Sequence, residues 1–587
     1  MLSLLDELGR SAAAALRASL GDAAAVPDVL PIVRSQKDDL QTAAALQFAK
    51  AAKKPPRELA DVIAKALASH PAVAGTEIAG PGFVNVRLSD TWLVAHAGDG
   101  LVMSDVGKGQ RVVLDYSSPN VAKPMHIAHI RSTIIGDAIK RSMRAVGYEV
   151  VADNHLGDWG TQFGKLIVAY RKWLDADAFA KNPVDELLRI YIRFTEEEKA
   201  QRGANAKAPT VDDADDDVPD AAAPPILQEA RAELVKLQKG DPENVALWKS
   251  FVDVSMKEFD RIYARLGVSF DVVLGESAYN DALAKTVETL LAKGIAEESE
   301  GAIVVTFDKA RDGEALPPLL VRKADGGFLY GTTDIAGVLY RVERWNPSRI
   351  VIVTDERQQL HFRQFFAAAR RLGITTSLEH VWFGLMRLPE GTISTREGKI
   401  ISLESLLDEA ERRALVVARE ANAELDEKEA REIARVVGLG AVKYNDLSKD
   451  RQTLVTFTWD KALALTGNTA PYLQYAYARI RSMGRKATEQ GFTAGPIVSM
   501  TPVERELVLR LLGFAGAVHD VAKTTRPHLL CDYLFDLAMA FSTFYNEAPV
   551  LKAEPDVRAG RLTLAALVAD TLQKGLDLLG IDVVERM

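Results

Sequence analysis

Hydrophobic and polar positions divide the chain into a mixed α/β part and a helical part. Apolar runs at residues 112–114 and 150–152 predict strands, and the segment that precedes the second run has helical spacing that ends at Gly147, a C-cap residue. Further apolar runs at 270–277, 328–330 and 349–353 predict more of the same sheet. This order of strands and helices predicts a doubly wound parallel sheet that binds ligands at the carboxyl ends of its strands.

The first 107 residues predict a small α/β domain ahead of that sheet. Residues 1–20 mix charged and apolar positions with helical spacing, which fits a folded amphipathic helix better than a signal peptide. Leu59, Ile63 and Leu67 recur at the spacing of one helix face, and the alternation over 83–88 predicts a half-buried strand.

After about residue 410 the pattern becomes almost wholly helical. The segment TPVERELVLRLLGFAGAVHDVAK places Thr501 at an N-cap, Pro502 at the first helical position and Glu504 where it completes a capping box. We therefore expect an all-α domain over residues 411–587.

Two insertions interrupt the predicted sheet, at about 161–255 and 278–327. The first is mostly helical but contains a segment at 202–225 that is rich in aspartate, glycine, alanine and proline. Such a composition cannot bury enough apolar surface to fold, so we predict an exposed loop. A functional acidic arm is the less favoured alternative.

Composition narrows the class of protein. A chain of 587 residues is too long for one core and should contain three or four domains, and 48% hydrophobic with 26% charged residues is ordinary for a soluble globular protein. The net charge of −9 argues mildly against a protein that coats nucleic acid, although a local basic track remains possible. The single cysteine, Cys531, excludes an internal disulfide and a cysteine-based zinc site, and it favours a reducing, cytoplasmic compartment. No run of about eighteen apolar residues occurs, so we expect no transmembrane span.

The strongest chemical signal is the stretch from Ser118 to His129, between the predicted strand and the helix. A strand-to-helix junction directs backbone N–H groups and the positive end of the helix dipole at a ligand. His126 and His129 lie three residues apart, with Lys123 just upstream, so cationic donors gather where a phosphate chain could lie. The stretch predicts a nucleotide site. By itself, an HxxH pair is more often a polar patch or half of a metal site.

The surrounding residues carry a resemblance to a known family. The run DYSSPNVAKPMHIAHIRSTIIGDAIKRSMRAVGYEV, followed by NHLGDWGTQFG from Asn154, resembles the signature region of class I aminoacyl-tRNA synthetases, and within them of the arginyl-tRNA synthetases. HIAH stands where the class has HIGH, with Ala128 in place of the glycine. The resemblance continues in GPGFVNVRL, in YNDLSKDRQTLVTFTWDKALALTGNTAPYLQYAYARIRS and in LLGIDVVERM.

The resemblance implies a fold and a function. It implies a Rossmann-type catalytic domain over 108–410, between an N-terminal domain (1–107) that contacts the tRNA elbow and a helical bundle (411–587) that contacts the tRNA stem and reads the anticodon. The implied activity is that of an arginine–tRNA ligase, which forms arginyl-adenylate from arginine and ATP and transfers arginine to tRNA(Arg), with tRNA needed for activation. Mg²⁺ would accompany ATP, zinc and a membrane would have no part, and the family is generally monomeric.

The resemblance assigns the ATP contacts to two loops. His126 and His129 would contact the phosphates and the charge that develops on them. The second loop of the class, KMSKS, corresponds to a degenerate segment with no lysine before Ser394, and Lys123 would substitute for the missing cation. The ATP contacts implied in this segment are Ser394, Thr395, Arg396 and Lys399, although a solvated turn is nearly as good an interpretation of Lys399.

Arginine needs a carboxylate, because its guanidinium is planar and permanently charged. Tyr330 and Asp334 match the pair that binds the guanidinium in the family. Without the family, Asp334 would be interpreted as an acidic residue in the first turn of a helix. The other end of the substrate is assigned, by the same resemblance, to Ser118, Pro119, Asn120, His129 and Gln358.

The 3′ end of tRNA must reach the same pocket. Aromatic, polar and basic side chains suited to stacking unpaired bases follow one another at Tyr472, Gln474, Tyr475, Tyr477 and Arg479. For any one of the aromatics, a place in the core of a helix is an equally good interpretation. The basic cluster at residues 50–57 is better explained as a solvated face than as an RNA contact.

Two other functions remain open from the sequence. One is a nucleotidyltransferase with the same histidine motif that transfers adenylate to a small molecule without RNA. The other is a noncatalytic tRNA-binding protein, supported only by Ala128 and by the irregular segment at 392–399.

Overall fold

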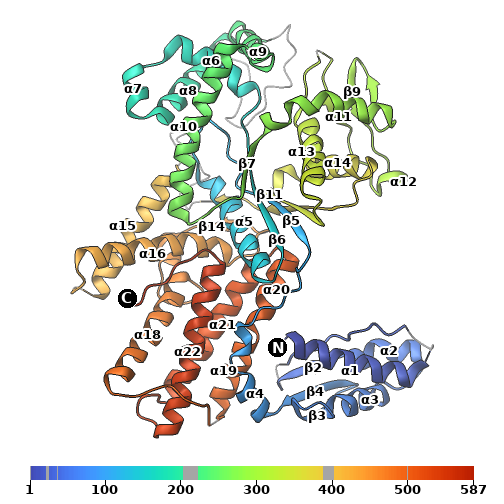
Figure 1. Ribbon diagram of the computed structural model, residues 1–587, viewed down its shortest axis with the longest axis vertical. Helices are drawn as coiled ribbons and strands as arrows, with labels where there is room; N and C mark the ends of the chain where they lie inside the picture. The colour runs from blue at the N-terminus through green and yellow to red at the C-terminus, as the bar shows by residue number, and fades with distance from the viewer. Residues whose placement is uncertain are drawn as a thin grey trace.

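The computed structural model describes residues 2–21, 25–35, 38–202, 223–324, 326–387, 402–422, 424–498 and 500–587, without the side chains of residues 2, 3, 128 and 421. A parallel sheet lies at the centre of the molecule (Figure 1). Two lobes lie above it in this view, and a bundle of helices and a separate N-terminal α/β domain lie below it.

The N-terminal domain packs three helices on an antiparallel sheet of strand order β1-β2-β4-β3. The predicted helix at the N-terminus and the one around Leu59 are confirmed, as is the strand at 83–88. Asn85 is buried between Val84 and Val86, where its side chain accepts a hydrogen bond from Gln41 (2.6 Å), so that strand does not alternate cleanly. The elements are α1 (Leu2–Leu20), β1 (Val33–Arg34), β2 (Leu40–Thr42), α2 (Ala44–Ala52), α3 (Pro56–Ala68), β3 (Val73–Ala79) and β4 (Phe83–Leu88), followed by α4 (Asp90–His96).

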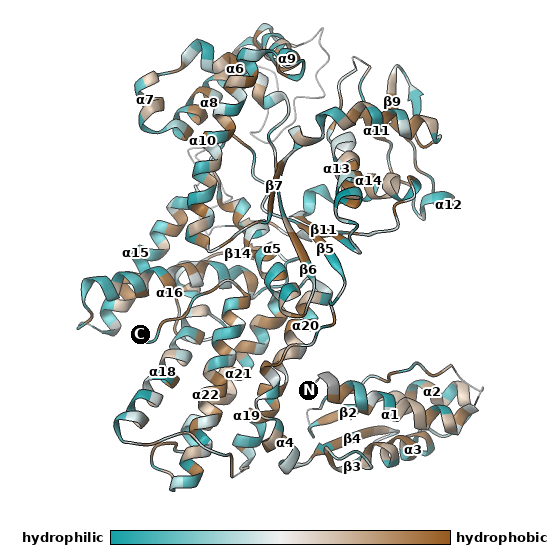
Figure 2. Cartoon of the chain, in the orientation of Figure 1, coloured by the Kyte–Doolittle hydropathy of each residue, from teal (hydrophilic) through white to brown (hydrophobic). Residues whose placement is uncertain are grey.

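The central sheet is five-stranded and parallel, in the order β12-β11-β5-β6-β7. Its strands are β5 (Arg111–Asp115), β6 (Glu149–Leu156), β7 (Val272–Gly275), β11 (Arg349–Asp355) and β12 (Ser377–Phe383). The strands predicted at 112–114, 150–152 and 349–353 and the helix between the first two, α5 (Ile127–Ala145), are confirmed. Figure 2 shows hydrophobic colouring along β6 and β7 in this sheet.

Alternation along β5 and β11 divides the core between the two faces of the sheet. Val112 and Val351 pack in the cluster that contains α5, whereas Val113 and Ile350 pack with α13 (Tyr330–Trp345) and α14 (Gln359–Arg371). Successive side chains of a strand point to opposite faces, so helices cover both sides, as in a doubly wound fold.

The strand predicted at 328–330 is wrong. Phe328 makes only an isolated bridge with Arg322, and Tyr330 is already the first residue of α13. The carbonyl of Leu329 accepts hydrogen bonds from the N–H groups of Thr332 (2.9 Å) and Thr333 (3.3 Å), which starts the helix. A short apolar run next to a helix start cannot be told from a strand by its pattern alone.

Two insertions form the two lobes (Figure 1). The first is helical, with α6 (Thr161–Trp173), α7 (Ala176–Lys181), α8 (Pro183–Arg202), α9 (Pro225–Gln238) and α10 (Pro242–Leu266). Residues 203–222, which hold most of the predicted acidic loop, lie outside the described residues. The second contains α11 (Asn280–Ala292), α12 (Lys309–Asp312) and an antiparallel sheet of β8 (Glu297–Ser299), β9 (Ala302–Val305) and β10 (Leu319–Arg322).

The predicted helical part is confirmed, with one exception. A short parallel pair joins β13 (Met386–Arg387) to β14 (Val455–Thr456). The capping box at Thr501 is present, and Gly513 divides the helical segment that follows into two. The helices are α15 (Leu403–Ala421), α16 (Glu427–Leu447), α17 (Trp459–Ala462), α18 (Ala470–Glu489), α19 (Pro502–Leu512), α20 (Phe514–Thr524), α21 (His528–Glu547) and α22 (Pro555–Leu578). In the described part of the chain, no helix is long and apolar enough to cross a membrane.

Candidate active site

The loop between β5 and α5 has an unusual backbone. Ser117, Ser118 and Ala122 adopt left-handed conformations, with φ of 75°, 49° and 65°. The N–H groups of these three residues donate to side chains from three other elements: Ser132 Oγ (2.9 Å), Asn154 Oδ1 (3.1 Å) and Ser255 Oγ (2.8 Å). Strain of this kind persists only where the surroundings impose it, and it is common at active sites.

The same loop is joined to the segment that follows β6. Gly157 N–H donates to the Pro119 carbonyl (3.2 Å), and the Gly157 carbonyl accepts from Val121 N–H (3.1 Å). A Cβ on Gly157 would lie 2.1 Å from Asn120 Oδ1, so a larger residue at this position would displace the side chain of Asn120. Pro119 is buried, Ser118 is half-buried and Asn120 is exposed, all at the carboxyl ends of the strands.

The two histidines of the motif contact each other, with ring centroids 3.9 Å apart. The backbone N–H of His126 donates to Nδ1 of His129 (3.1 Å), so a neutral His129 ring carries its proton on Nε2. Burial lowers the pKa of His129 to about 3, and the nearby His126 and Lys123 act in the same direction. At neutral pH, His129 is therefore an uncharged donor.

The segment that follows residue 401 returns to this motif. His126 forms a backbone bridge with Ser402, and Leu403 N–H donates to the Met125 carbonyl (2.9 Å). The predicted second ATP loop, with Ser394, Thr395, Arg396 and Lys399, lies outside the described residues, but the residues on its carboxyl side adjoin the histidines. Lys123 stands over the ring of Tyr191 on α8, 5.0 Å from the ring centroid.

The predicted guanidinium-binding pair lies at the start of α13. Tyr330 is exposed, and Asp334 follows one turn later. Asp334 Oδ2 lies 2.5 Å from His361 Nε2 on α14, a contact that sequence reasoning missed. Gln358 is exposed and lies just before α14. A histidine three residues after Gln358 was the only available signal for this contact.

Glu276 is a second residue that sequence reasoning missed. It follows β7 directly, and burial raises the pKa of its carboxyl well above the usual range, with the charges of Asp334 and Asp158 acting in the same direction. The charges of Asp334 and Asp158 therefore lie close enough to disfavour ionisation of Glu276, an effect that a bound cation would relieve. The available signal was an acidic residue at the carboxyl end of a predicted strand.

A buried ion cluster ties the start of the histidine loop to α13. Arg341 on α13 donates to Asp115 on β5 (2.6 Å) and to Asp153 on β6 (2.8 and 3.1 Å). The other oxygen of Asp115 accepts from Ser118 Oγ (2.9 Å). The helix that carries Tyr330 and Asp334 is thus held in register with the loop that carries Ser118.

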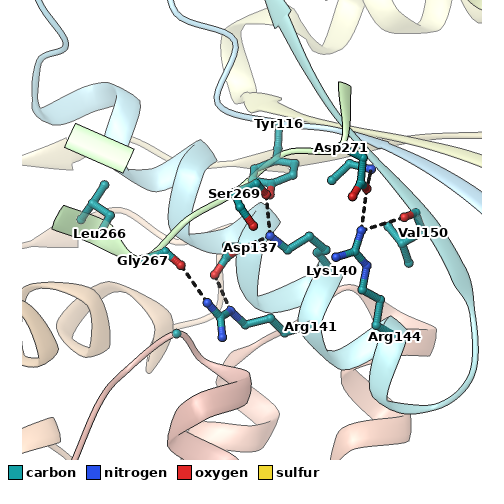
Figure 3. A network of polar contacts seen from close by, with 12 residues as sticks. Tyr116, Asp137, Lys140, Arg141, Arg144, Val150, Leu266, Gly267, Ser269 and Asp271 are labelled. Atoms are coloured by element: carbon teal, nitrogen blue, oxygen red, sulfur yellow. Dashed lines mark hydrogen bonds and ion pairs between the residues drawn. The ribbon is translucent and has the colours of Figure 1, made fainter. Parts of the chain in front are cut away.

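The C-terminal half of α5 is joined by hydrogen bonds to the segment between α10 and β7 (Figure 3). Asp137, which is buried, pairs with Lys140 (2.6 Å) and with Arg141 (2.7 Å). Lys140 also donates to the Ser269 carbonyl (2.7 Å), and Arg141 donates to the Gly267 carbonyl (2.8 Å). These bonds fix the position of α5, and with it the position of the histidines at the N-terminal end of the helix.

A second anchor lies just after the histidines. Arg131 is buried and pairs with Asp446 on α16 (2.8 Å), and it donates to the Gly384 carbonyl in the turn after β12. The histidine helix is therefore bonded both to the sheet and to the helical part of the chain.

The structure separates the five predicted tRNA-contacting residues. Gln474 is buried and donates to the Asp582 carbonyl (2.8 Å), and Tyr477 is buried and donates to Glu585 (2.8 Å). These two belong to the packing of the bundle, as the alternative interpretation had it, so they have no surface to offer to a base. Tyr475 is exposed, and Tyr472 and Arg479 are half-buried, so all three retain exposed surface.

Among the described residues, no group of three histidine, cysteine, aspartate or glutamate side chains is arranged to hold a metal ion.

The fold and the histidine loop define a class I tRNA synthetase, and the family described as "tRNA synthetases class I (R), catalytic domain" matches residues 94–459. The descriptions "DALR anticodon binding domain" and "Arginyl tRNA synthetase N terminal domain" match residues 473–587 and 10–88. The chain belongs to the arginyl-tRNA synthetase family, so the resemblance noted in the sequence is confirmed. The catalytic match runs to residue 459, beyond the boundary predicted at 410.

Similarity to known proteins extends over most or all of the chain. The chain is 42% identical to the Arginine--tRNA ligase of Fusobacterium nucleatum over 538 residues, covering 91% of the chain and 90% of the relative. It is 41% identical to the Arginine--tRNA ligase of Hahella chejuensis, covering 100% of both. Thermus thermophilus arginyl-tRNA synthetase superimposes with a TM-score of 0.83 at 25% identity, again covering 100% of both chains.

Proposed function

We propose that the chain is an arginine–tRNA ligase, which forms arginyl-adenylate and pyrophosphate from arginine and ATP and then transfers arginine to the 3′ end of tRNA(Arg). The observation that carries the proposal is the pairing of a histidine motif at the β5–α5 junction with a carboxylate site at the start of α13. Both sites lie at the carboxyl ends of parallel strands, where such sheets bind ligands.

The histidine loop is the proposed site of adenylate formation. A carboxylate oxygen of arginine attacks the α-phosphorus, the bond from that phosphorus to the bridging oxygen breaks, and pyrophosphate leaves. His129 offers a neutral Nε2–H donor, and His126, in ring contact with it, is the second donor to the charge that develops on the phosphates. Because α5 is anchored at both ends, these donors require little reorganisation during the reaction.

Arginine recognition is assigned to the carboxylates around α13. Asp334 and Glu276 would receive the guanidinium, with Tyr330 beside them. Approach of a cation lowers the pKa of Glu276 and favours its ionised form. Ser118, Pro119, Asn120, His129 and Gln358 are the proposed contacts at the amino acid end, where the strained loop presents its backbone.

The remaining ATP contacts are Lys123, Ser394, Thr395, Arg396 and Lys399. Mg²⁺ would arrive on the ATP phosphates and neutralise their charge. The proposed zinc-free chemistry needs no further metal.

Transfer to tRNA is assigned to the helical part. Tyr472, Tyr475 and Arg479 on α18 would contact the unpaired 3′ end through their exposed surface. The proposed division of labour is residues 1–107 for the tRNA elbow, 108–410 for catalysis with insertions at 161–255 and 278–327, and 411–587 for the tRNA stem and the anticodon. We further propose a cytoplasmic monomer that needs bound tRNA for adenylate formation.

The test is aminoacylation with radiolabelled arginine, ATP and a tRNA(Arg) transcript. We expect acid-precipitable arginine on the tRNA that depends on ATP, and no incorporation of labelled citrulline, whose side chain has the same shape without the charge. Equal charging with citrulline would overturn the assigned role of Asp334, and no charging with either substrate would overturn the proposed function.

A further inference from the structure

His361 is not among the proposed substrate contacts, but it makes a short polar contact with one of them, Asp334. Its Nε2 lies 2.5 Å from Asp334 Oδ2, across the gap from α14 to α13. Among the described residues, the contact with His361 is the one hydrogen bond or ion pair that Asp334 makes, so its other carboxylate oxygen, Oδ1, accepts no hydrogen bond from them. Asp334 is thus held by one oxygen only.

Packing holds the His361 ring in place. The ring contacts Phe365, with centroids 5.3 Å apart, and Phe362 on the same helix. Phe362 in turn stacks on His380 of β12 at 4.0 Å, and His380 Nε2 is hydrogen-bonded to Thr354 Oγ1 (2.7 Å). His361 therefore packs against aromatic rings that extend to His380 on β12 of the central sheet.

The charged groups that face His361 come from several elements. Burial lowers the pKa of His361, but the hydrogen bond and the negative charge of Asp334 outweigh burial and raise it above the ordinary value. On β12, burial lowers the pKa of His380 to about 4, with Arg451 acting in the same direction and Asp355 opposing it, so His380 stays neutral near pH 7. Glu276, beyond Asp334, has a raised pKa and is the other titrating neighbour.

We propose that His361 is a positioning residue for arginine recognition, which holds one oxygen of Asp334, leaves the other for the substrate guanidinium, and makes arginine affinity depend on its own protonation. The inference rests on the proposed function and deepens it.

The sign of this dependence follows from the charges. A protonated His361 neutralises Asp334 and weakens the attraction for a second cation, the guanidinium. A neutral His361 keeps the Nε2–H bond but leaves the negative charge for the substrate. The KM for arginine therefore falls as pH rises through the pKa of His361, and bound arginine releases a proton from the ring.

The test compares three variants of the full chain in aminoacylation assays from pH 6 to pH 8, with saturating ATP and tRNA. His361→Gln keeps an N–H donor that does not titrate, and His361→Leu keeps bulk without a donor. The matched control is His519→Gln. His519 lies on α20 near Asp520 and is 27% exposed, against 28% for His361. Circular dichroism and thermal unfolding confirm that each variant folds.

We expect His361→Leu to raise the arginine KM about tenfold at pH 8, the effect of losing one hydrogen bond to a charged group, with kcat changed less than about threefold. In His361→Gln, the decrease of arginine KM with pH should flatten, leaving only the part due to Glu276, while the KM for ATP stays constant. His519→Gln should follow the wild-type profile.

Two results would overturn the inference: equal pH profiles for the wild type and His361→Gln, or an unchanged arginine KM in a folded His361→Leu. A loss of kcat alone would assign His361 to structure and also overturn it. If the wild type itself charges no arginine, the proposed function has failed, which the wild-type reaction distinguishes from a failure of the His361 inference.

Discussion

Replacement of Arg341 by methionine tests how α13 is held to the sheet. The Arg341 side chain is 4% exposed, and its partners Asp115 and Asp153 are 5% and 0% exposed. Arg341→Met keeps most of the bulk but leaves two buried carboxylates without their cation. Breaking a buried ion cluster in this way costs about 3–5 kcal/mol of folding free energy.

The dependence on pH gives a second readout. Burial raises the pKa of Asp153, and Arg341 acts in the opposite direction. Without Arg341, the folded-state pKa of Asp153 rises further above its value in the unfolded chain. A group with a raised folded pKa stabilises below its unfolded pKa and loses that contribution as pH rises. The deficit of Arg341→Met should therefore be larger at pH 7.5 than at pH 5.

The assay is urea unfolding followed by circular dichroism, with the first transition compared because a chain of several domains does not unfold in one step. The control is Arg412→Met. Arg412 pairs with Glu409 at 2.7 Å but is 62% exposed, so its loss should cost less than about 1 kcal/mol. Asp153→Asn added to Arg341→Met should restore part of the stability. If Arg341→Met is as stable as Arg412→Met, the buried cluster does not hold α13 as described.

Three further variants probe the site. His129→Asn should lower kcat about 10²–10³-fold in aminoacylation, the loss expected for one donor to developing charge. The pKa of His129 in the folded chain is about 3, far below that of an unfolded histidine, so the wild type loses stability as pH falls from 6.5 toward 3. In His129→Asn this pH-dependent loss should be absent, which urea unfolding midpoints measured across this pH range would show. Asp334→Asn should raise the arginine KM about 10²-fold without changing the KM for ATP, and an equal rise in both would refute its assignment. Tyr475→Ala should raise the KM for tRNA about tenfold, through loss of one stacked base, while the KM for arginine stays constant. An unchanged KM for tRNA would refute the proposed contact between Tyr475 and the tRNA.

Local signals explain what could be predicted. The strand that ends at Asp115, the helix after His126 and the capping box at Thr501 each follow from residues within a few positions of one another. The run at 328–330 failed because three apolar residues fit a strand and a helix start equally well.

Contacts between segments far apart in the sequence explain what could not be predicted. Glu276, Asp334 and His361 come from three separate elements, and nothing within each segment indicates that they lie together. In the bundle, nothing in the sequence distinguishes Gln474 and Tyr477 from the exposed Tyr475 beside them. The structure shows that these two side chains face the interior of the bundle, where they bond to the segment after α22. A helix brings adjacent positions to different faces, so composition could indicate the segment but not the individual contacts.

Arginine-dependent ATP–pyrophosphate exchange, measured with and without tRNA(Arg), tests the proposed activity most directly. We expect exchange only when arginine and tRNA are both present. Exchange without RNA on a different small substrate would instead indicate a nucleotidyltransferase. No exchange under any condition, despite tRNA binding, would indicate a noncatalytic tRNA-binding protein, and either result would contradict the assignment of an arginine–tRNA ligase.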